Sequence, residues 1–125
     1  MIRRKELENH FDETIWVEVL VKGQHFLLCN TYRPELTDQE YWARLIHAIE
    51  IRYQINENIV IIGDLNSDLL TTNNNKLLDI MNLFNFTNVI KHPTRVTEHS
   101  STLLDPLILS DSLKCFYSDV LKFPE

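Results

Sequence analysis

The sequence predicts an α/β (α+β) domain, and three observations support this class. Two apolar-rich segments with strand-like alternation, residues 14–21 and 25–31, are joined by a tight Lys-Gly-Gln turn and predict an antiparallel hairpin. A helical pattern over residues 37–54 then leads into a wholly apolar strand at residues 59–62. A second helical pattern, at residues 74–84, precedes further short apolar segments.

Both predicted helices have readable signals. Thr37 and Glu40 form a capping box at the start of the first helix, which is expected to end near Gln54. Its apolar positions recur at helical spacing, namely Trp42, Leu45, Ile46, Ile49 and Tyr53. The second helix carries its apolar face at Leu77, Leu78, Met81 and Phe84.

Shorter elements are expected after the second helix. The pattern predicts a short strand or extended segment at residues 86–90, a polar loop at residues 92–101, and a strand at residues 102–109 that Pro106 interrupts. Residues 116–121 predict one more strand. No linker divides the chain, so residues 1–125 are expected to belong to one domain.

The composition is that of a globular protein, with 44% hydrophobic and 24% charged residues. The net charge of −6 counts against purely electrostatic binding of nucleic acid. It is compatible with an Mg²⁺-dependent enzyme whose site is rich in carboxylates. Cys29 and Cys115 lack metal-ligand spacing and predict buried free thiols. There is no secretory signal, and no apolar run approaches the roughly 20 residues that span a bilayer. We therefore expect an intracellular protein, nuclear or cytoplasmic, that is neither secreted nor bound to a membrane.

The first candidates for chemistry follow the apolar strand. Gly63 ends that strand, and Asp64 and Asn66 come directly after it. Polar side chains at the carboxyl end of a strand in an α/β sheet project into the crevice where ligands bind. A carboxylate can serve there as a general base or lie near a metal, and a carboxamide can orient a water or bind a phosphate oxygen. The same residues also fit a plain strand-to-loop turn.

Four phrases in order extend this observation. They are Asn-Thr-Tyr-Arg-Pro at residues 30–34, Gly-Asp-Leu-Asn at 63–66, Pro-Thr-Arg-Val-Thr at 93–97 and Ser-Thr-Leu-Leu-Asp at 101–105. This series resembles the endonuclease/exonuclease/phosphatase superfamily and, more narrowly, the endonuclease domain of LINE-like (non-LTR) retrotransposons. The resemblance implies a two-sheet sandwich flanked by helices, which hydrolyses a phosphodiester of DNA with Mg²⁺ or Mn²⁺.

The resemblance also implies roles for individual residues. Asp64 would activate the attacking water, Asn66 would hold the phosphate and the geometry of Asp64, and Tyr32 would hydrogen-bond the scissile phosphate. Asp105 would orient a catalytic histidine. Contacts with the substrate are implied for a further group, namely Arg33, Arg95, Ser101 and Thr102. The metal ligands stay unassigned.

Each of these side chains has a structural alternative. Tyr32 can be a packing aromatic at a strand end, and Asp105 can begin a turn. Arg33 and Arg95 can be solvated surface groups, while Ser101 and Thr102 can bond only to nearby backbone.

Two further phrases of the family do not occur in the chain. One is an early-strand Gln-Glu-Thr-like phrase with the metal-binding glutamate, and the other is Ser-Asp-His with the catalytic histidine; residues 118–120 read Ser-Asp-Val. We therefore expect residues 1–125 to form a partial, C-terminal piece of such a domain, lacking its first strands and its final His-bearing segment. The chain as given is then expected not to cleave DNA efficiently.

Three functions stay open on these observations. The first is a fragment of a retrotransposon endonuclease, with DNA as its partner and a reverse transcriptase domain downstream in the full polyprotein. The second is a non-catalytic remnant that acts at most as a binding module. The third is a phosphatase of the same superfamily. The phrases at residues 93–97 and 101–105 favour the retrotransposon.

Overall fold

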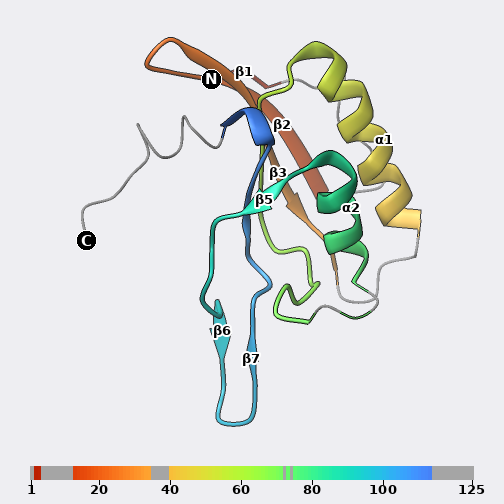
Figure 1. Ribbon diagram of the computed structural model, residues 1–125, viewed down its shortest axis with the longest axis vertical. Coiled ribbons are helices and arrows are strands. Elements are labelled where there is room, and N and C mark those ends of the chain that lie inside the picture. The colour runs from red at the N-terminus through yellow and green to blue at the C-terminus, as the bar shows by residue number, and fades with distance from the viewer. Residues whose placement is uncertain (1, 4–12, 35–39, 72, 74, 114–125) are drawn as a thin grey trace.

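Six strands form one mixed sheet in the computed structural model, which describes residues 2–3, 13–34, 40–71, 73 and 75–113 (Figure 1). Their spatial order is β1 (Ile2–Arg3), β2 (Glu13–Val21), β3 (Gln24–Tyr32), β4 (Ile59–Ile62), β8 (Leu107–Leu109) and β5 (Thr87–Asn88). Neighbouring strands are antiparallel except β3 and β4, which are parallel. The predicted α/β (α+β) class is confirmed.

The predicted hairpin is confirmed as β2 and β3. Val21 pairs with Gln24, and the two residues between them, Lys22 and Gly23, have φ values of 49° and 79°. Positive φ at both central residues is the two-residue hairpin turn whose twist matches that of the strands. The long register then carries β3 to Tyr32, where the chain leaves the sheet.

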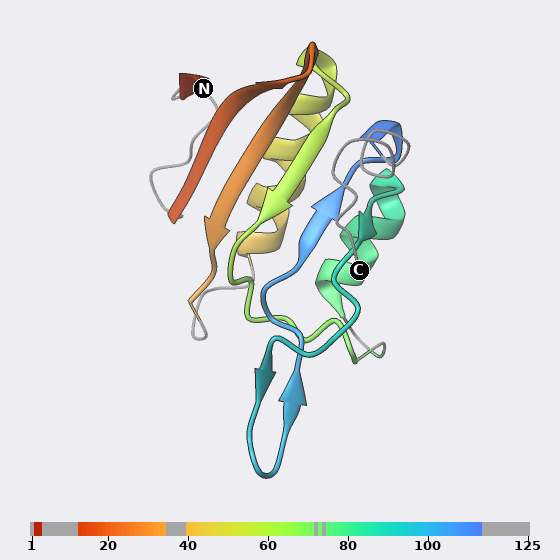
Figure 2. The same cartoon turned by 90° about the vertical axis from the view of Figure 1, so that its left-hand side faces the viewer.

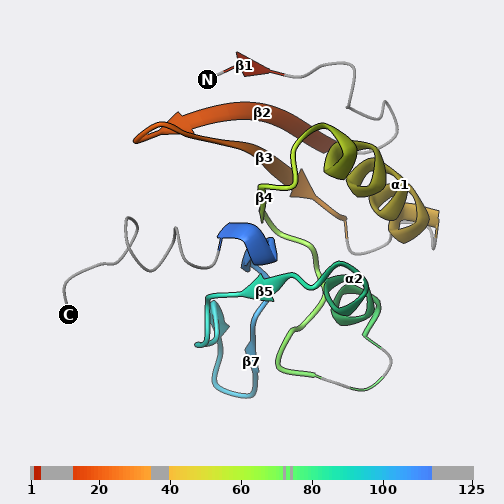
Figure 3. The same ribbon diagram turned by 45° about the horizontal axis from the view of Figure 1, so that its top comes forward.

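Helix α1 (Glu40–Ile55) and helix α2 (Lys76–Phe84) lie on the same face of the sheet (Figure 3). Helix α1 is the crossover that parallel strands require, since it connects β3 with β4. Asn75 caps α2 by accepting a hydrogen bond from the amide of Leu78. The capping threonine predicted for α1, Thr37, and the predicted helix start at residue 74 lie outside the described residues.

The buried face of α1 differs from the prediction at one turn. Arg52 is fully buried, whereas Tyr53, predicted for the core face, is 39% exposed. The Arg52 guanidinium lies 4.6 Å from the ring centre of Trp16 in β2, where a flat cation stacks favourably on an aromatic face. Tyr53 instead stacks on Phe84 of α2, with ring centres 6.5 Å apart.

The core lies between the sheet and the two helices. Its strand residues share one parity, because alternate side chains of a strand point to opposite faces, and they are Trp16, Leu27, Cys29, Ile59, Ile61 and Ile108. The opposite face of the sheet carries a smaller cluster, centred on Phe26, Val60, Leu109 and Leu113. Leu113 belongs to the short 3-10 helix η2 (Asp111–Leu113).

The segment between β5 and β8 corrects two predictions. Residues 92–101, predicted as a loop, contain most of a two-stranded antiparallel ribbon made of β6 (Arg95–Val96) and β7 (Ser101–Thr102), and this ribbon projects from one end of the sheet (Figure 2). The strand predicted at 102–109 is split, because Pro106 lacks the amide hydrogen that a continuous ladder needs and β8 begins after it. The strand predicted at 86–90 is confirmed as the shorter β5.

Some predictions fall on residues that the structure does not describe. These are the strand at 116–121, Cys115 and the Ser-Asp-Val phrase at 118–120. Neither described helix is both long enough and apolar enough to cross a lipid bilayer.

Candidate functional site

One edge of the sheet brings together residues that are far apart in the sequence. The parallel strands β3 and β4 end at this edge, and β8, antiparallel to β4, begins there. Tyr32 is the last residue of β3, Asp64 follows β4 after Gly63, and Asp105 precedes β8. The β6–β7 ribbon leaves the sheet at the same end (Figure 2).

Gly63 allows the loop after β4 to lie close against β3. Its φ is +126°, and a Cβ placed on it would lie 1.9 Å from the carbonyl oxygen of Thr31. Only glycine fits such a close approach of two backbones. Beyond this point the amide of Arg33 donates to the carbonyl of Asp64 over 2.8 Å, so the two chains stay joined past the ends of the strands.

Asp64 and Asn66 form a tight turn that also presents a carboxylate. The amide of Asn66 donates to Oδ1 of Asp64 over 3.1 Å, and Asn66 adopts a left-handed conformation with φ 48°. The side-chain amide of Asn66 donates to the carbonyl of Arg33 over 2.6 Å. A strand-to-loop turn is therefore present, and it leaves Oδ2 of Asp64 within hydrogen-bond distance of Arg95 in the β6–β7 ribbon.

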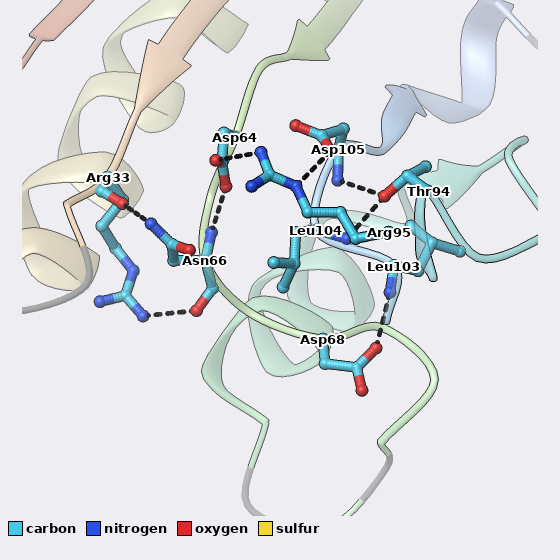
Figure 4. Close-up of polar contacts among 9 residues, drawn as sticks. All are labelled: Arg33, Asp64, Asn66, Asp68, Thr94, Arg95, Leu103, Leu104 and Asp105. Atoms are coloured by element: carbon cyan, nitrogen blue, oxygen red, sulfur yellow. Dashed lines mark hydrogen bonds and ion pairs between the residues drawn. The ribbon is translucent and has the colours of Figure 1, made fainter. Parts of the chain in front are cut away.

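Arg95 connects the two candidate carboxylates (Figure 4). Its Nη2 donates to Oδ2 of Asp64 over 2.7 Å, and its Nε donates to Oδ2 of Asp105 over 3.3 Å. The side chain of Arg95 is 52% exposed, that of Asp64 only 18%, and that of Asp105 40%. The hydrogen bond with Asp105 and the negative charges of both carboxylates raise the pKa of Arg95 above its ordinary value.

The backbone of Asp105 is held by Thr94, a residue that sequence reasoning did not single out. Oγ1 of Thr94 accepts hydrogen bonds from the amides of Leu104 and Asp105, over 3.1 and 3.3 Å. The amide of Thr94 donates to the carbonyl of Thr102 over 2.9 Å. The one available signal was the position of Thr94 inside the phrase at residues 93–97.

Asp68 is a second residue that sequence reasoning missed. Its Oδ1 accepts from the amide of Leu103 over 2.9 Å and from that of Leu70 over 3.0 Å, while Oδ2 accepts from the hydroxyl of Thr71. Partial burial raises the pKa of Asp68, but these three hydrogen bonds outweigh it and lower the pKa below its ordinary value. Asp68 thus ties the loop after β4 to the segment before β8 (Figure 4).

The remaining candidates have different surroundings. Tyr32 is 43% exposed at the sheet edge. Arg33 directs its guanidinium to the carbonyls of the Asp64–Asn66 turn. In the ribbon, Ser101 is exposed and Thr102 is half-buried.

The carboxylates fit one mode of magnesium binding. Mg²⁺ takes oxygen ligands and is commonly held by one or two carboxylates together with substrate phosphates and waters. Asp64 and Asp105 offer such oxygens on either side of one guanidinium. The described ranges contain no group of three or more His, Cys, Asp or Glu side chains that could hold a metal ion.

Solved structures of low sequence identity share this fold. The endonuclease domain of TRAS1, a telomere-specific non-LTR retrotransposon, matches 90% of this chain with a TM-score of 0.70 and 10% identity, over 54% of its own length. A mannosyl-6-phosphatase of Bacteroides thetaiotaomicron matches 79% with a TM-score of 0.59 and 13% identity, over 43% of its length. An endonuclease/exonuclease/phosphatase family protein of the same bacterium matches 79% with a TM-score of 0.57 and 13% identity, over 42% of its length.

These matches establish the fold as that of the endonuclease/exonuclease/phosphatase type. The chain spans about half the length of the solved structures it matches. No family model and no curated protein matches the sequence.

Proposed function

We propose that the chain is part of a divalent-metal-dependent DNA endonuclease from a non-LTR retrotransposon. The observation that carries this proposal is the arrangement of Asp64 and Asp105 around the guanidinium of Arg95. This arrangement lies at the sheet edge where Tyr32 ends β3. Hydrolysis of a phosphodiester needs mainly positioned charge, because developing negative charge on the phosphate has to be stabilised. At this sheet edge the guanidinium of Arg95 and the phenol of Tyr32 can stabilise that charge, while the two carboxylates can act as a base or hold a divalent cation.

The roles follow from the contacts of each side chain. Asp64 would accept the proton of the attacking water, with its carboxylate oriented by the amide of Asn66 at Oδ1 and by the guanidinium of Arg95 at Oδ2. Tyr32 would donate a hydrogen bond to a phosphate oxygen, and Asp105 would orient a neighbouring acid or base. A bound Mg²⁺ or Mn²⁺, for which Asp64 and Asp105 offer oxygens, would neutralise charge on the phosphate.

We further propose that these 125 residues hold only part of the catalytic centre. The chain spans about half of the matched structures, and its sequence has no counterpart of the glutamate and histidine phrases. The first missing group would bind the metal and the second would complete the acid–base chemistry. We expect the chain alone to nick DNA slowly. A reverse transcriptase domain is expected downstream in the full polyprotein.

A phosphatase of the same fold is the second candidate. The match to the mannosyl-6-phosphatase, with a TM-score of 0.59, supports it. The higher TM-score of 0.70 over more of the chain, together with the phrases at residues 93–97 and 101–105, favours the endonuclease.

The decisive experiment is nicking of supercoiled plasmid by the purified, folded chain with Mg²⁺, with EDTA, and as the Asp64→Asn variant. Asp79→Asn is the matched control, because it removes an exposed carboxylate from α2. We expect slow nicking that requires Mg²⁺ and Asp64 but not Asp79. If the chain releases phosphate from a sugar phosphate but does not nick plasmid, the phosphatase proposal would replace the endonuclease proposal. If a folded sample shows neither nicking nor phosphate release, the non-catalytic remnant would be the function that is favoured.

A further inference from the structure

Arg33 makes an unusual set of contacts with the turn that carries Asp64. Its Nε donates to the carbonyl of Leu65 over 2.9 Å, and its Nη2 donates to the carbonyl of Asn66 over 3.1 Å. Its own amide donates to the carbonyl of Asp64, and its own carbonyl accepts from the side chain of Asn66. Arg33 therefore bonds to each of the three residues of this turn. Figure 4 shows its two contacts with Asn66.

The guanidinium is also fixed from behind by aromatic rings. Its Cζ lies 4.6 Å from the ring centre of Trp42 and 5.9 Å from that of Tyr41, at the start of α1. The hydroxyl of Tyr41 hydrogen-bonds Oγ1 of Thr31 over 2.8 Å, and both residues are buried. Stacking on rings that are themselves anchored restricts the guanidinium to one orientation.

We propose that Arg33 is a positioning residue, which holds the Asp64–Asn66 turn in the shape that its carboxylate needs. The Nε–Nη2 edge is one of the forks with which arginine binds phosphate bidentately, and here that edge is directed at two backbone carbonyls. The proposal rests on the proposed function, because it assigns Arg33 a task at the hydrolytic centre. It differs from the substrate contact that the resemblance implies for this residue.

A guanidinium suits this task better than an ammonium. Two successive carbonyls need two donors at a fixed separation, which a planar fork supplies and a single charged nitrogen does not. The turn also contains a left-handed residue, Asn66, and it follows a glycine, Gly63, that is packed against Thr31. A backbone with such conformations persists only when its surroundings hold it.

The first test is NMR hydrogen exchange on the ¹⁵N-labelled chain without substrate. We expect the Nε–H of Arg33 to be protected, because it is hydrogen-bonded to Leu65. In Arg33→Met we expect exchange at the amides of Leu65 and Asn66 to accelerate roughly ten- to hundredfold, since two charge-assisted bonds are lost. Arg33→Lys, which keeps the charge, should restore only part of the protection. Lys22→Asn is the control for charge, because Lys22 lies in the β2–β3 turn at the opposite end of β3.

The second test separates positioning from phosphate binding. If Arg33 contacts a phosphate, the Arg33→Met variant should bind a short DNA duplex more weakly than wild type. The slope of its DNA affinity against salt concentration, on logarithmic axes, should also fall by about one. If Arg33 positions the turn, the salt dependence of DNA affinity should be the same in Arg33→Met and wild type. Where the chain nicks plasmid, the variant should show a lower kcat with KM nearly unchanged.

Each outcome bears on one proposal only. An unprotected Nε–H, or exchange at Leu65 and Asn66 that stays within about twofold of wild type in Arg33→Met, would overturn the positioning role. A weaker salt dependence of DNA affinity in Arg33→Met would also overturn the positioning role and would favour a phosphate contact. Failure of the wild-type chain to nick DNA, with the exchange result as expected, would count against the proposed function and leave Arg33 as the residue that shapes the turn.

Discussion

Arg95 and Asp64, 31 residues apart, are joined by a hydrogen-bonded ion pair of 2.7 Å between Nη2 and Oδ2. Because Arg95 belongs to β6 and Asp64 follows β4, this pair fixes the projecting ribbon to the edge of the main sheet. The same guanidinium reaches Asp105, so both candidate carboxylates share one counter-charge. A cation that binds these carboxylates has to compete with a side chain that is already there.

Removal of Arg95 should therefore strengthen the binding of divalent cations at this edge. In Arg95→Gln we expect Mn²⁺ to broaden the NMR signals of Asp64 and Asp105 at concentrations a few-fold lower than in wild type. Lys91→Gln is the control, because it removes an equal charge whose ammonium bonds instead to the carbonyl of Asn88. Equal Mn²⁺ affinity in the two variants would show that Arg95 does not compete with the metal. High salt should reduce the difference in Mn²⁺ affinity between Arg95→Gln and wild type, because Arg95 is exposed and its charge is screened.

Thr94 offers a separate test of how Asp105 is held. Thr94→Val keeps the shape of the side chain but removes the acceptor for the amides of Leu104 and Asp105. We expect faster hydrogen exchange at these two amides and a loss of about 1 kcal/mol in the free energy of unfolding.

Thr97 provides the control for Thr94, because its Oγ1 accepts from the amides of His99 and Ser100 near the tip of the same ribbon. Thr97→Val should accelerate exchange near that tip and leave Asp105 protected. Acceleration at Asp105 in both variants would mean that the whole ribbon loosens and that Thr94 has no specific role.

Gly63 should tolerate substitution far less well than Gly23. Both have positive φ, but a Cβ on Gly63 would collide with Thr31, whereas one on Gly23 would meet no atom within 4 Å. We expect Gly23→Ala to lose about 1 kcal/mol and Gly63→Ala about 3 kcal/mol, because overpacking adds to backbone strain. Urea unfolding followed by circular dichroism measures both values. Equal losses would mean that the loop after β4 shifts to make room.

The main elements could be read from the sequence because their signals are local. Apolar alternation marks β2 and β3, and an apolar run marks β4. The ribbon gave no such signal, since residues 91–101 are exposed and their pairing depends on hydroxyls such as those of Thr94 and Thr97. Burial of Arg52 could not be predicted from α1 alone, because it depends on Trp16 in another element.

The candidate site was predictable in its members but not in their contacts. The family resemblance implied roles for Asp64, Asn66 and Asp105. The topology of the sheet brings Asp64 and Asp105 to one edge. The bridge made by Arg95 and the support from Asp68 depend on distances that arise only after the chain folds. Whether these residues catalyse a reaction stays a prediction.

Cys29 should be chemically inert in the folded protein. Its side chain is fully buried, and this burial raises the pKa of the thiol, although the positive charge of Arg52 lowers it in part. The thiolate is the reactive form, so the native thiol should resist an aromatic disulfide reagent at pH 8. In Cys115→Ser, which leaves Cys29 as the one thiol, we expect the reaction to be slower by orders of magnitude in buffer than in urea. Rapid reaction in buffer would show that the core around Trp16 opens readily.

Asp68 should make the protein sensitive to acid. Because the fold lowers the pKa of this carboxyl, its contribution to stability is complete above the unfolded value of about 3.9 and is lost as the pH falls through the folded value. Asp68→Asn keeps an acceptor for the amides of Leu103 and Leu70 but loses the charge, so we expect a loss of about 1 kcal/mol at pH 7.

The difference between wild type and Asp68→Asn should then shrink as the pH falls below about 4, because protonation of Asp68 removes the same charge that the substitution removes. Urea unfolding measured between pH 7 and pH 2.5 tests this, with Glu57→Gln as the control that removes an exposed carboxylate. A difference that stays constant over this range would show that the hydrogen bonds to Leu103 and Leu70 do not depend on the charge of Asp68. In that case the acid sensitivity of the fold would have to come from other carboxylates, and Asp68 would tie the two loops together by geometry alone.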